Sequence, residues 1–199
     1  MPVPKEEIEK ALKIKGEING MGLLEDKSFF LNHFGKEKLK EVEKEISEII
    51  GEDFSYEKVK AHQKYPFYLT LLATLILYYD FGRDENLIRE FGKESVKVSL
   101  TVKLFLRYAF SPEGVINYGP KLWKKYFSIG DVEIEKFDEK EKIAIVKIKN
   151  FNVHPLYCKQ LEGAIEQLFS YVIKEGKVRN EEIECVFRGD PVHKFKISW

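Results

Sequence analysis

The sequence predicts an α+β fold, in which a helical layer packs on a small antiparallel sheet that ends in a C-terminal β-hairpin. Apolar residues recur at helical spacing through the first two thirds of the chain, and they alternate with polar residues in the last third. No repeat, linker or low-complexity segment separates these two parts. We therefore expect one domain over residues 1–199.

The N-terminal part is expected to be mostly helical. A short strand is predicted at 11–18, where Leu12 and Ile14 share one face, and a short helical or irregular piece at 29–34. Gly51 and Gly92 are expected to end the helices that precede them. Helices are predicted at 36–50, 55–63, 67–79, 84–91, 93–110 and 115–126.

The last third is predicted to hold two hairpins and one helix. The first hairpin joins 131–137 to 142–149, and a helix runs from Pro155 to about Lys174. The second hairpin joins 185–187 to 192–199 through a turn at 189–191. Alternation then places two sets on the buried faces of its strands: Ile183, Cys185 and Phe187, and His193, Phe195, Ile197 and Trp199.

Composition excludes several classes of protein. Lys plus Arg equals Asp plus Glu, at 33 each, without a basic stripe, so neither a nucleic-acid partner nor a polybasic membrane patch is expected. The apolar run 67–79 is shorter than the roughly 20 residues of a membrane span, and the N-terminus has no apolar signal core, so we expect a cytoplasmic protein. Abundant Lys and Glu with two Cys and two Met is typical of a thermophile.

Four residues of the last third form a candidate metal site. Cys158 lies near a helix start, and a three-residue loop in the terminal hairpin would put Cys185 opposite His193, whereas a two-residue loop would put Lys194 there. His154, at the mouth of the same helix, offers a fourth donor. Two thiolates and two imidazoles make a tetrahedral zinc set, so zinc is a candidate cofactor. The alternatives are plain core packing, because free Cys is among the most buried residue types, and a Cys158–Cys185 disulfide if the source is a hyperthermophile.

Aromatic residues gather around the helix at 67–79, and no catalytic motif such as Gly-x-Ser-x-Gly or His-Glu-x-x-His accompanies them. Large rings dominate cores and dimer seams, and they also line apolar ligand pockets. We expect a pocket between this helix and the C-terminal sheet, lined by Phe67, Leu71, Leu75, Tyr78, Leu104 and Tyr108.

The C-terminal stretches "HPLYCKQLEGAIEQLF" and "IECVFRGDPVHKFKISW" resemble the closing segment of the 4-vinyl reductase-like domain. His193 stands where the last Cys of that pattern would be. The upstream part is similar to an uncharacterised, largely myxobacterial family, through Lys15-Gly16, Tyr65-Pro66, Phe91-Gly92 and "SPEG", and Trp199 fits as well. The residues that match the 4-vinyl reductase-like pattern are Cys158, Gly163, Cys185, Gly189, Asp190 and Phe195.

This resemblance implies a fold shared with haem-dependent nitric-oxide sensors and with a fatty-acyl-binding family of vesicle tethering subunits. Such relatives bind small apolar or planar ligands between helices and sheet, and a metal is attributed to the cysteines of the 4-vinyl reductase-like group. Haem is not expected, because the Tyr-x-Ser-x-Arg motif that holds its propionates in those sensors is absent.

The function expected from these observations is a non-enzymatic domain that binds or senses a small apolar molecule. The alternative is a scaffold module without a ligand that dimerises through the aromatic helix, and a homodimer is expected in either case. An enzyme subunit acting on tetrapyrroles is a third hypothesis, but no acid–base pair in the sequence supports it.

Overall fold

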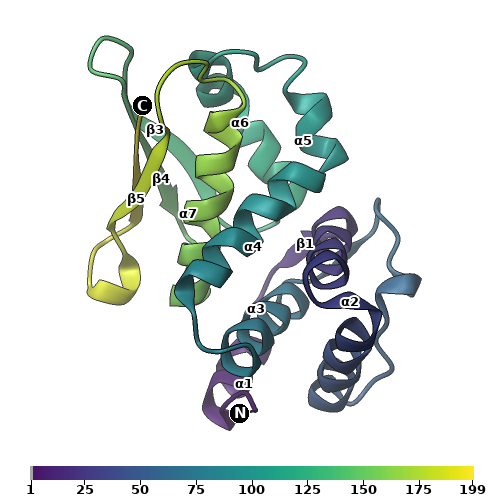
Figure 1. Ribbon diagram of the computed structural model, residues 1–199. Coiled ribbons are helices and arrows are strands. Elements are labelled where there is room, and N and C mark those ends of the chain that lie inside the picture. The colour runs from purple at the N-terminus through teal and green to yellow at the C-terminus, as the bar shows by residue number, and fades with distance from the viewer. Residues whose placement is uncertain (1) are drawn as a thin grey trace.

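The computed structural model describes residues 2–199 and places a group of N-terminal helices beside a layered part built from helices and a sheet (Figure 1). A two-stranded antiparallel ladder ties the N-terminal group together, with Ile18 paired to Tyr65. The elements of this group are α1 (Lys5–Leu12), β1 (Glu17–Asn19), α2 (Gly20–Ile50), η1 (Tyr56–Lys58), β2 (Lys64–Pro66) and α3 (Tyr68–Asp80).

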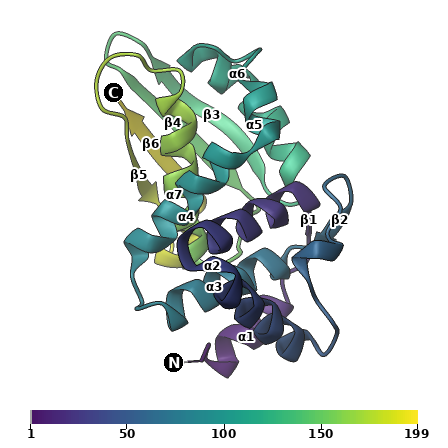
Figure 2. The same cartoon turned by 45° about the vertical axis from the view of Figure 1, so that its right-hand side comes forward.

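The rest of the chain forms a four-stranded antiparallel sheet, in the order β3-β4-β6-β5, with helices against one of its faces (Figure 2). This arrangement confirms the predicted α+β class and its C-terminal hairpin. The helices are α4 (Glu85–Val98), α5 (Leu100–Phe105), α6 (Pro112–Tyr126) and α7 (Pro155–Ser170). The strands are β3 (Asp131–Asp138), β4 (Ile143–Lys149), β5 (Arg179–Glu184) and β6 (His193–Ser198), and a short turn of helix, η2 (Val186–Arg188), lies between the last two.

Helices α4 and α7 cross at two glycines. A Cβ on Gly92 would lie 1.8 Å from the carbonyl oxygen of Gln160, and one on Gly163 would lie 1.9 Å from that of Arg89. The prediction that Gly92 ends a helix was therefore wrong. Gly92 lies inside α4 because only a residue without a side chain lets the two backbones approach so closely.

The predicted strand at 11–18 is wrong in its first half. Residues 5–12 form α1, in which Lys10 pairs with Glu6 and Glu7 one turn earlier, and only 17–19 are extended. Charge pairs at helical spacing and an acidic first turn favour a helix over the two-residue alternation that suggested a strand.

Two other helical predictions also change length. Helix α2 runs from Gly20, much earlier than predicted, and bends at Gly35, whose φ of 81° breaks the helical geometry. The predicted helix at 55–63 is only the turn η1, and the one at 93–110 is interrupted at Ser99, whose side chain accepts from the Val102 amide at 3.1 Å. Ser favours helix starts for this reason.

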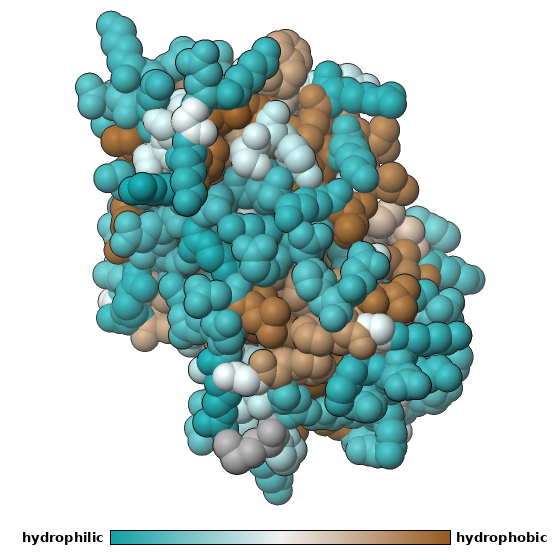
Figure 3. All heavy atoms as spheres, in the orientation of Figure 1, coloured by the Kyte–Doolittle hydropathy of each residue, from teal (hydrophilic) through white to brown (hydrophobic). Residues whose placement is uncertain are grey.

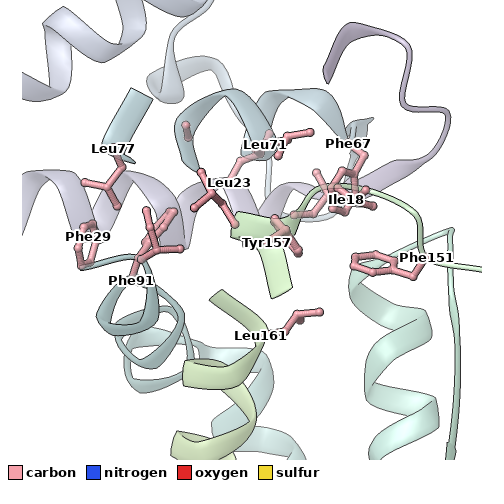
Figure 4. Close-up of a cluster of buried hydrophobic side chains, with 14 of the residues drawn as sticks. Ile18, Leu23, Phe29, Phe67, Leu71, Leu77, Phe91, Phe151, Tyr157 and Leu161 are labelled. Atoms are coloured by element: carbon pink, nitrogen blue, oxygen red, sulfur yellow. The ribbon is translucent and has the colours of Figure 1, made fainter. Parts of the chain in front are cut away.

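One buried apolar cluster extends from the N-terminal helices into the layered part. Figure 4 shows Phe67, the residue before α3, Leu71 of α3 and Ile18 of β1 near Tyr157 and Leu161 of α7. Helix α3 is buried almost all round from Leu69 to Leu77, which confirms that this apolar run is a core helix. Within residues 2–199, no helix is both long and apolar enough to span a membrane.

The terminal hairpin differs from the predicted one in two ways. Its first strand is β5 at 179–184, whereas the predicted strand at 185–187 falls largely in the turn η2, and β5 contains a β-bulge. Asn180 pairs with Ile197 and Glu184 with Lys194, so β5 has one extra residue between Glu182 and Glu184. The bulge turns Ile183 outward, where it is 41% exposed, and Phe187 is exposed to a similar degree, contrary to their predicted burial. Because the bulge shifts the alternation by one, Glu182 and Cys185 both face the interior.

Candidate functional sites

A cavity of about 170 Å³ lies between the covering helices and the sheet. Its walls are apolar side chains of α4, α6 and α7 on one side and of β3 and β4 on the other, including Val96, Leu122, Ile134, Val146 and Leu168. An apolar cavity of this size is large enough to hold a ring the size of benzene.

One end of the cavity is polar, because Glu25 and Asp26 of α2 and Thr70 of α3 reach it. All three are buried. The Tyr126 hydroxyl donates a 2.6 Å hydrogen bond to Glu25 Oε1 and is itself hydrogen-bonded to Ser99 Oγ. Asp26 Oδ2 and Thr70 Oγ1 lack a hydrogen-bond partner among the described residues.

Burial controls the protonation of Glu25 and Asp26. Removal from water raises the pKa of Glu25 from 4.5 to about 7, against the lowering effect of the hydrogen bond from Tyr126. The pKa of Asp26 rises well above its ordinary value for the same reason, and the neighbouring charge of Glu25 adds to the increase. Glu25 is therefore largely protonated at slightly acidic pH, and Asp26 ionises less readily than an exposed aspartate.

The residues predicted to line a pocket lie elsewhere. Phe67, Leu71 and Leu75 are fully buried in the core around α3, and Tyr78 is half-buried at its edge. Leu104 is 56% exposed and Tyr108 72% exposed. The six residues are not brought together, and none of them lines the cavity. The helical assignment was correct, but packing against α1, α2, α4 and α7 leaves α3 no open face.

The same burial removes α3 as the dimer surface that the scaffold hypothesis needed. Apolar side chains are exposed instead along and after α5, at Leu100, Leu104, Tyr108 and Phe110. Figure 3 shows brown, apolar atoms on the upper right of the face seen in Figure 1, where α5 lies. Homodimer formation stays a prediction, and α3 is not its interface.

A second site lies under the terminal hairpin. One ligand atom each from Cys158, Glu182, Cys185 and His193 falls within 4.8 Å of all the others, and the four residues are buried. Cys158 comes from the first turn of α7, Glu182 and Cys185 come from β5 and the residue after it, and His193 begins β6. The pairing of Glu184 with Lys194 agrees with the register that brings Cys185 beside His193, and it excludes the register that placed Lys194 there.

Hydrogen bonds orient the imidazole of this cluster. His193 Nε2 lies 3.0 Å from the carbonyl oxygen of Phe151, which can only accept, so Nε2 carries a proton. Nδ1 faces Glu182 Oε1 at 2.8 Å and Cys158 Sγ at 3.6 Å. A histidine that donates one ring nitrogen to a backbone carbonyl presents the other as it would to a metal ion.

The pKa values of the cluster reflect two buried thiols that lie beside the carboxylate of Glu182. Burial raises the pKa of Cys158, and the charge of Glu182 raises it further. Burial would also raise the pKa of Glu182, but hydrogen bonds from His193 and both thiols hold it below its ordinary value. The thiols are therefore protonated in the metal-free cluster, and His193 Nδ1 donates to Glu182, so a divalent cation would have to displace the protons of the thiols and of Nδ1.

His154, the fourth predicted ligand, is not part of the cluster. Its Nδ1 accepts from the Leu156 amide at 3.1 Å and caps α7, and its Nε2 lies 2.6 Å from Glu7 Oε2 of α1. Asn, Asp and Ser are the usual residues at this position, and here the histidine acts in the same way. Glu182 supplies the fourth donor in its place.

Sequence reasoning missed Glu182, Glu25 and Asp26. Unbroken alternation would place Glu182 on the face opposite to Cys185, and a bulge has no clear signature in one sequence. Glu25 and Asp26 lie in a stretch read as a loop, although an acidic pair between Leu24 and Phe29 was a signal of carboxyl groups on a partly buried helix.

The fold and the cavity define a class, an α+β protein whose helices enclose an apolar space against an antiparallel sheet. Solved structures of haem nitric-oxide-binding (H-NOX) proteins share this fold. An unliganded Fe(II) H-NOX protein mutant from K. algicida is 15% identical, with a TM-score of 0.63, over 91% of this chain and 96% of that one. An H-NOX protein from S. oneidensis with Fe(II)NO is 11% identical, with a TM-score of 0.61, over 91% and 98%. An oxygen-binding H-NOX domain related to soluble guanylate cyclases is 13% identical, with a TM-score of 0.63, over 91% and 94%.

These likenesses show the fold and confirm that part of the resemblance found in the sequence. No model of a known protein family matches the chain, and no curated protein matches it. The resemblance to the 4-vinyl reductase-like group and to the myxobacterial family is therefore not confirmed.

The expectation about haem needs correction. It relied on a missing propionate motif, whereas the solved structures that share the fold are named for haem and its iron. Among the described residues that line the cavity, none is His, Cys or Met, so iron could be reached only by oxygen ligands such as Tyr126, whose pKa burial raises. The lining thus offers no imidazole or sulfur ligand for a haem iron. Because the solved structures with this fold are named for haem, haemin is one of the molecules to test for binding.

Proposed function

We propose that this protein is a binding or sensor domain for a small, largely apolar molecule held in the cavity between α4, α6, α7 and the sheet. The observation that carries the proposal is the cavity itself, which has apolar walls and one polar end. Ligand sites are typically concave and apolar, with a few placed polar groups. The shared fold with H-NOX proteins, among them an oxygen-binding domain, supports a ligand-binding role.

The first experiment tests occupancy. The protein is analysed by native mass spectrometry after purification, and then titrated calorimetrically with toluene and, by absorbance, with haemin. We expect either a co-purifying small molecule or saturable binding of one ligand per chain. A protein that carries nothing and binds neither probe contradicts the proposal.

A matched pair of variants localises the binding. Ser95 lines the cavity, and among the described residues its hydroxyl donates to the Phe91 carbonyl one turn back. Ser95→Leu fills part of the cavity and should weaken binding about tenfold or more, whereas Ser95→Ala removes the hydroxyl without filling the space and should bind normally. Equal loss in both variants would place the ligand elsewhere.

We also propose that Cys158, Glu182, Cys185 and His193 hold a divalent metal ion of the zinc type. The observation that favours this second candidate is the convergence of four ligand atoms within 4.8 Å, from three elements, with the imidazole already oriented. Thiolate, imidazole and carboxylate are ordinary zinc ligands, and a set closed by four protein groups is typical of a structural site.

Metal content measured by elemental mass spectrometry tests this proposal. Protein purified without chelator is expected to contain about one zinc per chain, and Cys185→Ser is expected to lose it. His154→Asn is the matched control, because His154 caps α7 and lies outside the cluster. If the wild-type protein is purified without metal and also fails to bind added zinc, the proposal is wrong and the four residues are ordinary core residues.

A further inference from the structure

We infer that the cavity ligand carries a basic nitrogen, which binds as a cation at the polar end formed by Asp26, Glu25 and Thr70. The inference rests on the proposed function, since it names the chemical class of molecule that the same cavity takes. Its basis is the set of polar atoms at that end which the protein itself leaves without partners.

The unpaired oxygens are the first argument. Asp26 is 2% exposed and Thr70 1% exposed, and both line the cavity. Thr70 lies close enough to Asp26 to lower its pKa and also interacts with Tyr157, but neither Asp26 Oδ2 nor Thr70 Oγ1 meets a partner with full hydrogen-bond geometry among the described residues. Buried polar atoms are nearly always paired, and an exception requires an explanation. A ligand that donates hydrogen bonds into this end of the cavity supplies one.

The balance of charge is the second argument. Two adjacent carboxyl groups reach the cavity, and within the described part of the chain no Lys, Arg or His lines it. The groups that face the pair from the packed elements are the phenols of Tyr56 in η1, Tyr126 in α6 and Tyr157 in α7. Glu43, which accepts from the Tyr56 amide, adds another acid nearby. A buried carboxyl group without a cationic partner avoids ionisation, so a ligand that brings a cation would allow this pair to ionise and form a buried ion pair.

The number of donors is the third argument. Glu25 Oε1 is already occupied by the Tyr126 hydroxyl, which leaves Asp26 and Thr70 as open acceptors. An ammonium group carries three donors and a charge, and a hydrogen bond between ionised partners is about twice as strong as a neutral one. A carboxylic acid ligand would bring a third acid to the same place. A neutral acceptor would satisfy only a protonated Asp26.

Binding of a cation must then release a proton. In the empty protein, burial raises the pKa of Glu25 to about 7 and raises that of Asp26 well above its ordinary value. A bound ammonium group favours an ionised carboxylate, so the pair gives up about one proton to solvent on binding. Affinity for a basic ligand should rise as pH increases from 6 to 8, by up to about tenfold.

Three probes of one size test the inference on the intact protein: benzylamine, benzyl alcohol and toluene. Calorimetry at pH 6 and pH 8, in two buffers with different ionisation enthalpies, gives both affinity and proton release. At pH 8 we expect benzylamine to bind at least about tenfold more tightly than benzyl alcohol. Its binding should release close to one proton at pH 6 and much less at pH 8, where Glu25 is already largely ionised in the free protein. Asp26→Asn should remove this preference while toluene binding persists, which also shows that the variant is folded.

The outcomes separate the two proposals. If toluene or benzyl alcohol binds but benzylamine binds no more tightly and without dependence on pH, the inference is overturned and the proposed function stands. If none of the probes binds the wild-type protein, the proposed function fails, and the inference fails with it. If Asp26→Asn keeps the full preference for benzylamine, the cation does not bind at this end of the cavity.

Discussion

At the scale of single residues, the two candidate sites depend on which polar side chains the fold buries next to one another. Cys158, Cys185 and His193 could be predicted, because soft ligands on apolar faces are visible in the sequence. Glu182 could not, since a bulge of one residue decides whether it faces water or the thiols. His154 was predicted for the wrong role because its pairing with Glu7 joins positions 147 residues apart.

The clearest prediction at this scale concerns Glu25. Its pKa in the folded protein is about 7, against 4.5 as the ordinary value, so the folded state binds more protons than the unfolded state between these two pH values. The free energy of unfolding of the wild-type protein should therefore fall as pH rises through this window, by at most about 3 kcal/mol from Glu25. Glu25→Gln removes this contribution and still accepts from Tyr126.

Urea denaturation at pH 5 and pH 8 measures the effect. Glu25→Gln should have nearly the stability of the wild-type protein at pH 5 and be more stable at pH 8. The exposed Glu52→Gln is the control and should track the wild-type protein at both values. A constant difference between Glu25→Gln and wild type across this range would show that Glu25 titrates normally.

At the scale of elements, the sequence predicted most helices and strands of the layered part, where periodicity is regular. The first hairpin, α6 and α7 lie close to their predicted positions. Errors arose where a long-range contact decides the outcome. Gly92 resembles a helix end in the sequence, and only the approach of α7 explains why α4 continues through it.

The crossing of α4 and α7 leads to a prediction for Gly163. A methyl group there would lie 1.9 Å from the Arg89 carbonyl oxygen, so the helices must separate. Gly163→Ala should lower the free energy of unfolding by about 1–3 kcal/mol, despite the better helix propensity of Ala. Gln167→Ala, one turn further along α7, should change it by less than about 0.5 kcal/mol. Thermal and urea denaturation give both values, and a stabilised Gly163→Ala variant would contradict the close approach.

At the scale of the whole molecule, distant segments of the chain enclose both candidate sites. The cavity is bounded by Gly22 near the N-terminus and by Phe169 near the C-terminus. The metal-type cluster joins α7 to the terminal hairpin. Single-sequence patterns describe each element alone, so the fold class could be predicted while the position of the cavity could not.

Arg89 holds three of these segments together, and its removal is the last prediction. Its guanidinium contacts Glu162 Oε2 at 2.5 Å, also Glu166, and the Asn180 carbonyl oxygen at 2.8 Å, thereby joining α4, α7 and β5. Although burial raises the pKa of Glu166, hydrogen bonds from Arg89 and Lys93 hold it below 4.5. Arg89→Met leaves Glu162 and Glu166 without this partner, and it should cost about 2–4 kcal/mol of unfolding free energy at pH 7.

The pH dependence of that loss distinguishes charge from packing. A carboxyl group whose pKa is lowered on folding adds stability above its ordinary pKa and loses it as pH falls through its folded value. The difference between wild type and Arg89→Met should therefore shrink as the pH falls below about 4.5 and Glu166 becomes protonated. Arg179→Met, at an exposed position of β5, should change stability little at either pH. A loss that is equal at pH 7 and pH 4 would show that Arg89 acts through packing of its apolar stem, and not through its charge.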